Sequence, residues 1–215
     1  MGLMSKPARQ PSVVPTIRPG EGTIALDIKI NTVSGVDGKS INFMGVDLSK
    51  APVPDRKFTA DTCSVVVSDY VLKLIFGQER IDGKGLRSAI VVQMTRNGGA
   101  NFVRFCDGLA NPSLDEVAKS ERIPSEKPSP PAEEPPQALT LSANMPFPAV
   151  SGHEACVDFY EASPFSMGVA ARAHKLSLEP VVRIDMRTPL LLGLVHELRT
   201  QLAEELKFKI EVTAP

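Results

Sequence analysis

The chain has 215 residues, 42% of them hydrophobic, and its 24 basic and 25 acidic residues nearly cancel. Proteins that bind nucleic acid by neutralising phosphates normally carry a basic excess, so the charge balance argues against that class. No apolar run approaches the roughly 20 residues that cross a bilayer. The N-terminal segment also lacks the apolar core of a signal peptide. We therefore expect a cytoplasmic protein with no membrane association.

The N-terminal part of the chain predicts an extended arm followed by a strand. Residues 1–21 contain four prolines and little periodicity, which favours a flexible arm. Four apolar residues then alternate with other types between positions 24 and 30, the pattern of a strand with one buried face. Such a strand is suited to pairing with another chain. The predicted partner-binding residues lie here and in the alternating C-terminal segment: Ile24, Leu26, Ile28, Ile30, Phe208 and Ile210.

The same order of features then occurs twice. In each copy a short apolar strand leads to a Ser-x-aromatic corner, a second strand, a polar connection and a third strand that ends in Met. The first copy covers residues 64–76 and 89–96, and the second covers 155–169 and 181–188. We expect an antiparallel meander in the first copy, from strands 63–67, 70–76 and 86–94. In the second we expect a strand over 138–145 and then strands over 156–161, 165–173 and 178–186.

Each copy is followed by a predicted helix. In the second copy Thr188 is the expected N-cap, with Pro189 at the first helical position. An apolar stripe at helical spacing follows: Leu191, Leu194, Val195, Leu198 and Leu202. In the first copy Asn97 is the expected cap of a shorter helix, with Phe102, Val103 and Cys106 on one face. Two glycines, at about 1 kcal/mol each, would weaken that helix.

A proline-rich segment separates the copies. Residues 120–137 contain six prolines among Ser, Glu and Lys, a composition that favours disorder. The predicted organisation is a flexible arm over 1–21, a first strand-rich unit over 22–118, a disordered proline-rich linker over 119–137, and a second strand-rich unit with a C-terminal helix over 138–215. The predicted fold class is α+β, with two related antiparallel-sheet units that each carry a helix on one face.

The second copy also resembles a known family. The corner Ser163-Pro164-Phe165, the strand end Arg183-Ile184-Asp185-Met186, the Thr188-Pro189 step and the helical Leu198-Arg199-Thr200-Gln201-Leu202 carry the likeness. They resemble a short bacterial domain family of unknown function. The likeness covers residues 139–206 and, more weakly, 41–106, where Asn97 replaces the Thr-Pro step. It implies tandem, partly degenerate copies of that domain and no particular activity.

No pattern typical of catalysis or metal binding is present. The three cysteines, Cys63, Cys106 and Cys156, have no CxxC spacing, so we expect small buried thiols. On a strand, His153 and Glu154 would point to opposite faces, which argues against a metal site with Cys156. The glycines near 83 and 98 lack the residues of a phosphate-binding loop. We expect no enzymatic activity, no cofactor and no metal.

The predicted function is therefore binding without catalysis. We expect an assembly subunit or adaptor that docks a protein partner, or copies of itself, through sheet edges and apolar patches. One alternative is a nucleic-acid-binding protein that uses a basic rim formed by Arg80, Lys84, Arg87 and Arg96. Another is a holdase-like chaperone with an apolar groove beside the C-terminal helix.

Overall fold

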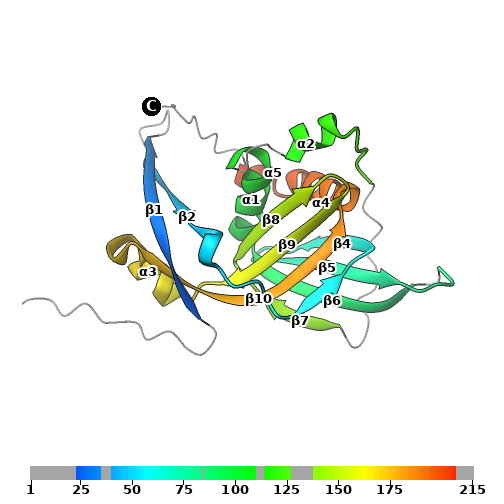
Figure 1. Cartoon of the computed structure of the whole chain (residues 1–215), viewed down its shortest axis with the longest axis horizontal. Helices are drawn as coiled ribbons and strands as arrows, with labels where there is room; N and C mark the ends of the chain where they lie inside the picture. The colour runs from blue at the N-terminus through cyan, green and yellow to red at the C-terminus, as the bar shows by residue number, and fades with distance from the viewer. Residues whose placement is uncertain (1–22, 35–39, 84, 110–113, 127–137, 207–215) are drawn as a thin grey trace, which may run out of the picture.

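The protein has the predicted α+β class, with two sheets and a group of helices (Figure 1). The computed structural model describes residues 23–34, 40–83, 85–109, 114–126 and 138–206. Four strands form the first sheet in the order β4-β5-β6-β7. The second has the order β2-β1-β10-β9-β8, with β3 also alongside β10.

The strands of the first sheet are β4 (Thr62–Val67), β5 (Val71–Glu79), β6 (Leu86–Thr95) and β7 (Leu139–Ser142). Those of the second are β1 (Ile24–Ser34), β2 (Ser40–Val46), β3 (Lys57–Thr59), β8 (Met145–Ser151), β9 (Glu154–Glu161) and β10 (Lys175–Arg187). The helices are α1 (Arg96–Arg104), α2 (Leu114–Ser120), α3 (Pro164–Ala173), α4 (Thr188–Gln201) and α5 (Ala203–Leu206). Two further turns are the 3-10 segment η1 (Leu48–Lys50) and the π-helical segment η2 (Phe105–Leu109).

One order of elements occurs twice along the chain. The first half runs β3-β4-β5-β6-α1, and the second runs β7-β8-β9-β10-α4 with α3 inserted after β9. Strands β4 to β6 pair in an antiparallel meander, and so do β8 to β10. Phe76 on β5 and Phe159 on β9 occupy matching places, and their ring centroids lie 5.9 Å apart in the core between the sheets.

The two halves exchange their first strands. β3 precedes the first meander but pairs in parallel with β10 of the second, where Phe58 lies opposite Ile184. β7 precedes the second meander but pairs in parallel with β6, where Leu141 lies opposite Val92. The residue after each exchanged strand donates its backbone N–H to a carbonyl of the neighbouring strand. Ala60 N donates to the Asp185 carbonyl at 2.8 Å, and Ala143 N donates to the Gln93 carbonyl at 3.0 Å.

The exchange places residues of both predicted units in each sheet. β1, β2 and β3 come from residues 22–118 but belong to the sheet of the second half, and β7 shows the reverse. A single hydrophobic core joins the halves and includes Phe76 and Phe102 with Phe159 and Leu194. The sheets therefore do not follow the predicted boundary between the units.

The first part of the predicted linker has defined contacts. α2 ends at Ser120, and Ile123 is buried in the common core. Glu126 N donates to the Pro189 carbonyl at 3.1 Å, and the Glu126 carboxylate pairs with Arg187. Residues 127–137, the rest of the predicted linker, lie outside the described residues.

Several local predictions were wrong. Residues 165–173 form helix α3 and not a strand, because the Ser163 hydroxyl accepts from Ser166 N at 3.1 Å and Pro164 lies in the first turn. The predicted strand over 138–145 is two strands, β7 and β8. The second continues to Ser151 despite Pro146 and Pro148, because β8 lies at an edge.

The helix caps also differ from the prediction. Thr95, and not Asn97, caps α1 by accepting from Gly98 N at 3.1 Å. Arg187 occupies the N-cap position of α4 without a side-chain cap bond. The buried Thr188 instead donates its hydroxyl to the Gly152 carbonyl at 2.7 Å and ties the helix start to the β8–β9 turn.

The predicted helix faces are confirmed. All five residues of the α4 stripe are buried: Leu191, Leu194, Val195, Leu198 and Leu202. The three residues predicted on one face of the first helix are also buried: Phe102, Val103 and Cys106. Close packing around Gly99 explains why α1 contains a glycine at this position. A Cβ there would lie 2.3 Å from Leu72 Cδ2 and 2.9 Å from Leu202 Cδ1. The helix therefore needs a residue without a side chain at this contact.

We predict opposite effects for two helical glycine substitutions. Gly99→Ala should destabilise the protein by about 1 to 3 kcal/mol, because the added methyl overpacks against Leu72. Gly168→Ala is the matched control in α3, where an added Cβ meets nothing within 4 Å. It should stabilise by about 0.4 to 1 kcal/mol through helix propensity and chain entropy. Urea unfolding followed by circular dichroism checks both, and equal effects would contradict this packing.

A second prediction concerns the exchanged strands. We expect a chain cut at a specific protease site placed within residues 127–137 to stay in one piece in native buffer, because β3 and β7 each pair with the other fragment. Size-exclusion chromatography after cleavage should give the elution volume of the uncut protein, and the fragments should separate only in denaturant. Two separately eluting folded fragments would contradict the exchange.

Candidate functional site

A two-stranded ribbon formed by β1 and β2 projects from the body of the molecule (Figure 1). β1 changes partner along its length: residues 24–27 pair with β10, and residues 28–34 pair with β2. β2 is the last strand in its sheet order, so no other strand within the described residues pairs with its outer edge. The ribbon therefore offers a row of backbone donors and acceptors.

The base of the ribbon is anchored in a second hydrophobic cluster. Leu26 and Ile28 are 2% and 5% exposed and pack in the cluster that contains Leu176, Leu178 and Tyr160. Ile28 N donates to the His174 carbonyl at 3.1 Å. The anchored base fixes the direction in which the ribbon leaves the sheet.

The predicted partner-binding residues do not form one surface in the described structure. The side chains of Leu26 and Ile28 belong to the chain's own core, and Ile24 is half-buried beside them. For Ile30 the structure gives the backbone pairing with Met44. Phe208 and Ile210 lie outside the described residues. Partner binding stays a prediction, and the surface available for it is the backbone edge of β2.

The register shows which β2 groups face outward. Asp47 N donates to the Asp27 carbonyl at 3.2 Å, so bonded and non-bonded pairs alternate from this point along the antiparallel ribbon. Gly45 and Phe43 therefore use their backbone groups toward β1. Asn42 and Met44 present their backbone N–H and C=O to the free edge.

Two of the other edge strands, β8 and β7, are less suited to pairing. β8 carries Pro146 and Pro148, which lack the N–H that an added strand would need. β7 has only 4 residues, and short edge strands offer few backbone bonds. The longest edge without prolines outside the two meanders is β2.

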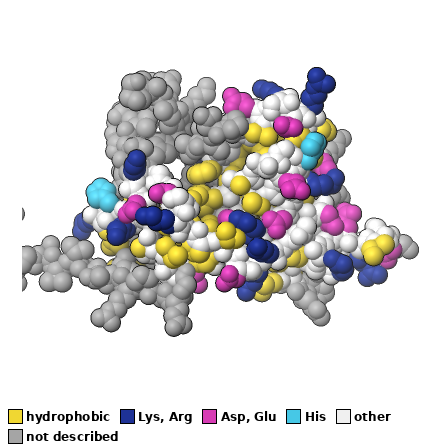
Figure 2. Space-filling view, in the orientation of Figure 1, with side chains coloured by type: hydrophobic (Ala, Val, Ile, Leu, Met, Phe, Trp, Pro, Cys, Tyr) yellow, Lys and Arg dark blue, Asp and Glu magenta, His cyan; other side chains and the backbone are white. Residues whose placement is uncertain are grey.

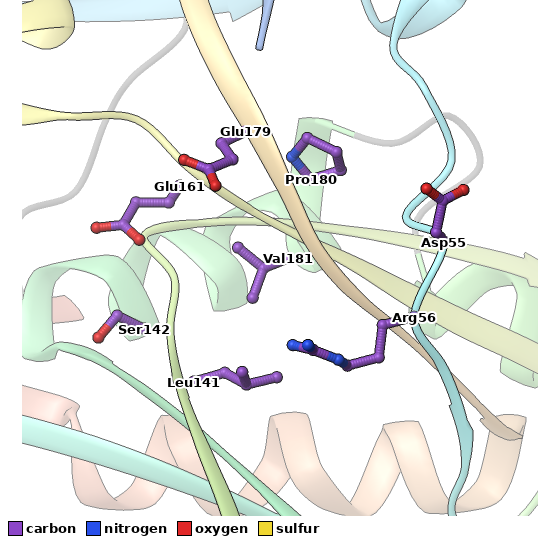
Figure 3. Close-up of a pocket in the computed structure, with 8 residues that line it drawn as sticks. All are labelled: Asp55, Arg56, Leu141, Ser142, Glu161, Glu179, Pro180 and Val181. Atoms are coloured by element: carbon purple, nitrogen blue, oxygen red, sulfur yellow. The ribbon is translucent and has the colours of Figure 1, made fainter. Parts of the chain in front are cut away.

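A pocket of about 410 Å³ lies where the exchanged strands meet the second sheet (Figure 3). Asp55 and Arg56 line it from the segment before β3, and Glu161 lines it from the end of β9. Its remaining walls are Leu141 and Ser142 of β7 and Glu179, Pro180 and Val181 of β10. Three carboxylates and one guanidinium give the lining an excess of negative charge.

Two of these carboxylates face one another. Glu161 and Glu179 are register partners across β9 and β10, next to an irregularity between Pro180 and Val182. Figure 3 shows the Arg56 side chain entering from the other side, alongside Leu141 and Val181. Within the described residues, neither glutamate side chain has an ion pair or hydrogen bond.

The described arginines of the predicted basic rim already contact acceptors. Arg80 pairs with Asp82 at 3.1 Å, and Arg87 donates to Gln78 Oε1 at 2.7 Å. Arg96 forms an ion pair with Glu205, which raises the pKa of Arg96 and lowers the pKa of Glu205. Lys84 lies outside the described residues. On the face in Figure 2, acidic and basic side chains are interspersed.

Arg183 and Asp158 form an ion pair across neighbouring strands of the second sheet. Arg183 donates twice to Asp158, at 2.6 Å to each carboxylate oxygen, across β10 and β9. This hydrogen bonding raises the pKa of Arg183. The sequence could have suggested the pair only if the register of the two strands had been known.

The candidate metal and thiol residues do not converge. His153 and Glu154 are exposed and Cys156 is half-buried. Among the described residues, no group of three or more metal-binding side chains comes together. Cys63 and Cys106 are buried and form no disulfide, and burial raises the pKa of each thiol to about 12. The predicted buried thiols are confirmed for these two.

Comparisons with known proteins add no relative: no family model, curated protein or solved structure matches the chain. The resemblance to a bacterial domain family therefore stays a prediction. No helix in the described part of the chain has the length and apolar character to cross a membrane.

The cysteine environments predict one accessible thiol in the native protein. At pH 8, Ellman's reagent should react slowly with Cys156, because this thiol is only half-buried but burial still raises its pKa. It should not react with Cys63 or Cys106, which are buried and have a pKa of about 12. All three should react in denaturant. Cys156→Ser should remove the native signal, whereas a signal that persists in this variant would contradict the described burial.

Proposed function

We propose that this protein is a non-catalytic assembly subunit or adaptor that binds a protein partner, or a second copy of itself, by pairing a strand with β2. The carrying observation is the ribbon edge, where β2 is anchored on one side and has no strand on the other within the described residues. Main-chain pairing at such an edge provides affinity without special side chains.

The anchored base supports this proposal. Leu26 and Ile28 hold β1 against β10, so the ribbon is presented in a fixed direction and little ordering entropy remains to be lost on binding. The prolines of β8 also discourage pairing at the opposite edge of the same sheet, which favours one mode of addition.

The two alternative functions receive less support. Nucleic-acid binding through the predicted rim would require Arg80, Arg87 and Arg96 to leave acceptors that they already contact. A chaperone groove beside the C-terminal helix would require part of its leucine stripe to be exposed, and the stripe lies in the core. Cytoplasmic location and the absence of catalysis belong to the same proposal.

The test is a proline at an edge-facing backbone position. Asn42→Pro removes an N–H that points away from β1, so it should leave the ribbon intact but block an incoming strand. Light scattering should give a mass above 23.1 kDa for the unmodified chain and the mass of a single chain for the variant. If the partner is another protein, co-purification from the native host should lose that protein with the variant.

Asn42→Ala is the matched control, since it changes the same side chain and keeps the backbone donor. It should assemble as the unmodified chain does, and circular dichroism should be the same for both variants. A chain that is a single-chain species at tens of micromolar and co-purifies with no stoichiometric partner would refute the proposal. Equal assembly by the proline variant would refute the role of this edge.

A further inference from the structure

The pocket has a counterpart in the first half of the chain, and that counterpart is closed. Gln78 on β5 lies two residues after Phe76, as Glu161 lies two residues after Phe159. Its Oε1 accepts from Ser88 Oγ and from Arg87 Nη2, each at 2.7 Å. Its Nε2 donates to the Thr59 carbonyl at the end of β3, at 2.9 Å. One amide thus links β5, β6 and the exchanged strand.

In the second half, both matching side chains are carboxylates. Glu161 faces Glu179 across β9 and β10, as Gln78 faces Ser88 across β5 and β6. An ionised carboxylate has no donor, so Glu161 cannot bond to Glu179 or to the carbonyl of Ser142, which matches Thr59 at the end of β7. Glu161 therefore does not make the link that Gln78 makes in the first half.

The lining indicates which group would fill this space. Like charges directly opposite on paired strands destabilise a sheet, so a cation between Glu161 and Glu179 would remove a repulsion and supply the missing donors. Leu141, Pro180 and Val181 form an apolar wall beside them. A short alkyl stem can lie on such a wall while its charged end reaches the carboxylates.

We propose that this pocket binds an organic cation, a primary ammonium or guanidinium group on a short alkyl chain. Such a group occurs in free amines and in the lysine and arginine side chains of polypeptides. Glu161 and Glu179 accept from the cation, and Leu141 with Val181 contacts the stem. Arg56 stands across the pocket from the carboxylates and limits the size of the ligand.

The first experiment uses small probes with the full chain. Isothermal titration calorimetry should detect binding of butylamine and agmatine, and no binding of butan-1-ol, which has the same stem without the charge. Glu161→Gln and Glu179→Gln should each weaken amine binding at least tenfold. The control Glu121→Gln changes an exposed carboxylate after α2, away from the pocket lining, and should leave binding unchanged.

A second variant copies the first half into the second. Glu161→Gln combined with Glu179→Ser recreates the Gln78 and Ser88 pair, so it should abolish amine binding. The amide can then donate to the Ser142 carbonyl, and the melting temperature should rise by about 2 to 4 °C for a gain of about 1 kcal/mol in a chain of this size. Retained amine binding by this double variant would overturn the proposal.

Two further experiments test the role of Arg56 and the source of the cation. Arg56→Ala should keep or strengthen amine binding, whereas loss of binding would mean that the carboxylates do not hold the ligand. A blocked arginine peptide that binds more tightly than agmatine would indicate a polypeptide side chain as the ligand, and the reverse order would indicate a free amine. No binding of either amine at millimolar concentration would overturn the proposal.

Discussion

The exchange of β3 and β7 between the halves is the constraint on which the rest of the structure depends. Each meander is completed by a strand that precedes the other meander, and each exchanged strand is followed by a matching backbone hydrogen bond. At both places the chain passes from one sheet to the other, because β3 leads into β4 and β7 leads into β8. The two sheets are thereby held face to face over a core that includes Phe76 and Phe159.

A core shared in this way leaves few surfaces for partners. The apolar faces of α1 and α4 are buried between the sheets, including Gly99 at its close contact with Leu72. Backbone is most available where β1 leaves β10 and continues with β2. The second hydrophobic cluster fixes this departure, because Leu26 and Ile28 are buried on either side of the change of partner.

Duplication also provides an internal comparison for individual residues. Some matching positions of the two halves have the same role, as do Phe76 and Phe159, which both pack in the core. Others differ in their polar contacts, as do Gln78 and Glu161. In the first half an amide both accepts and donates, and in the second a carboxylate only accepts. The amide links three strands through its hydrogen bonds, whereas the carboxylate lines a pocket of about 410 Å³.

The sequence by itself determined most of the secondary structure and the repeat. Period-2 alternation located β1, and short apolar segments bounded by turn residues located β4, β5, β6, β9 and β10. Helical spacing located the α4 stripe, because these patterns depend on neighbours within a few residues. It was wrong about residues 165–173, where the cap of Ser163 and Pro164 outweighed apolar content, and about Thr188, whose hydroxyl finds a tertiary acceptor in Gly152.

Only the tertiary structure decided which strands pair and which residues form sites. Nothing local distinguishes β3 pairing with β10 from β3 pairing with its own meander, because strand partners are chosen by burial over the whole core. For the same reason Leu26 and Ile28 were predicted to bind a partner but are core residues in the fold. Glu161 and Glu179 are 18 positions apart and become neighbours only through the register of β9 and β10, which no pattern within either strand specifies.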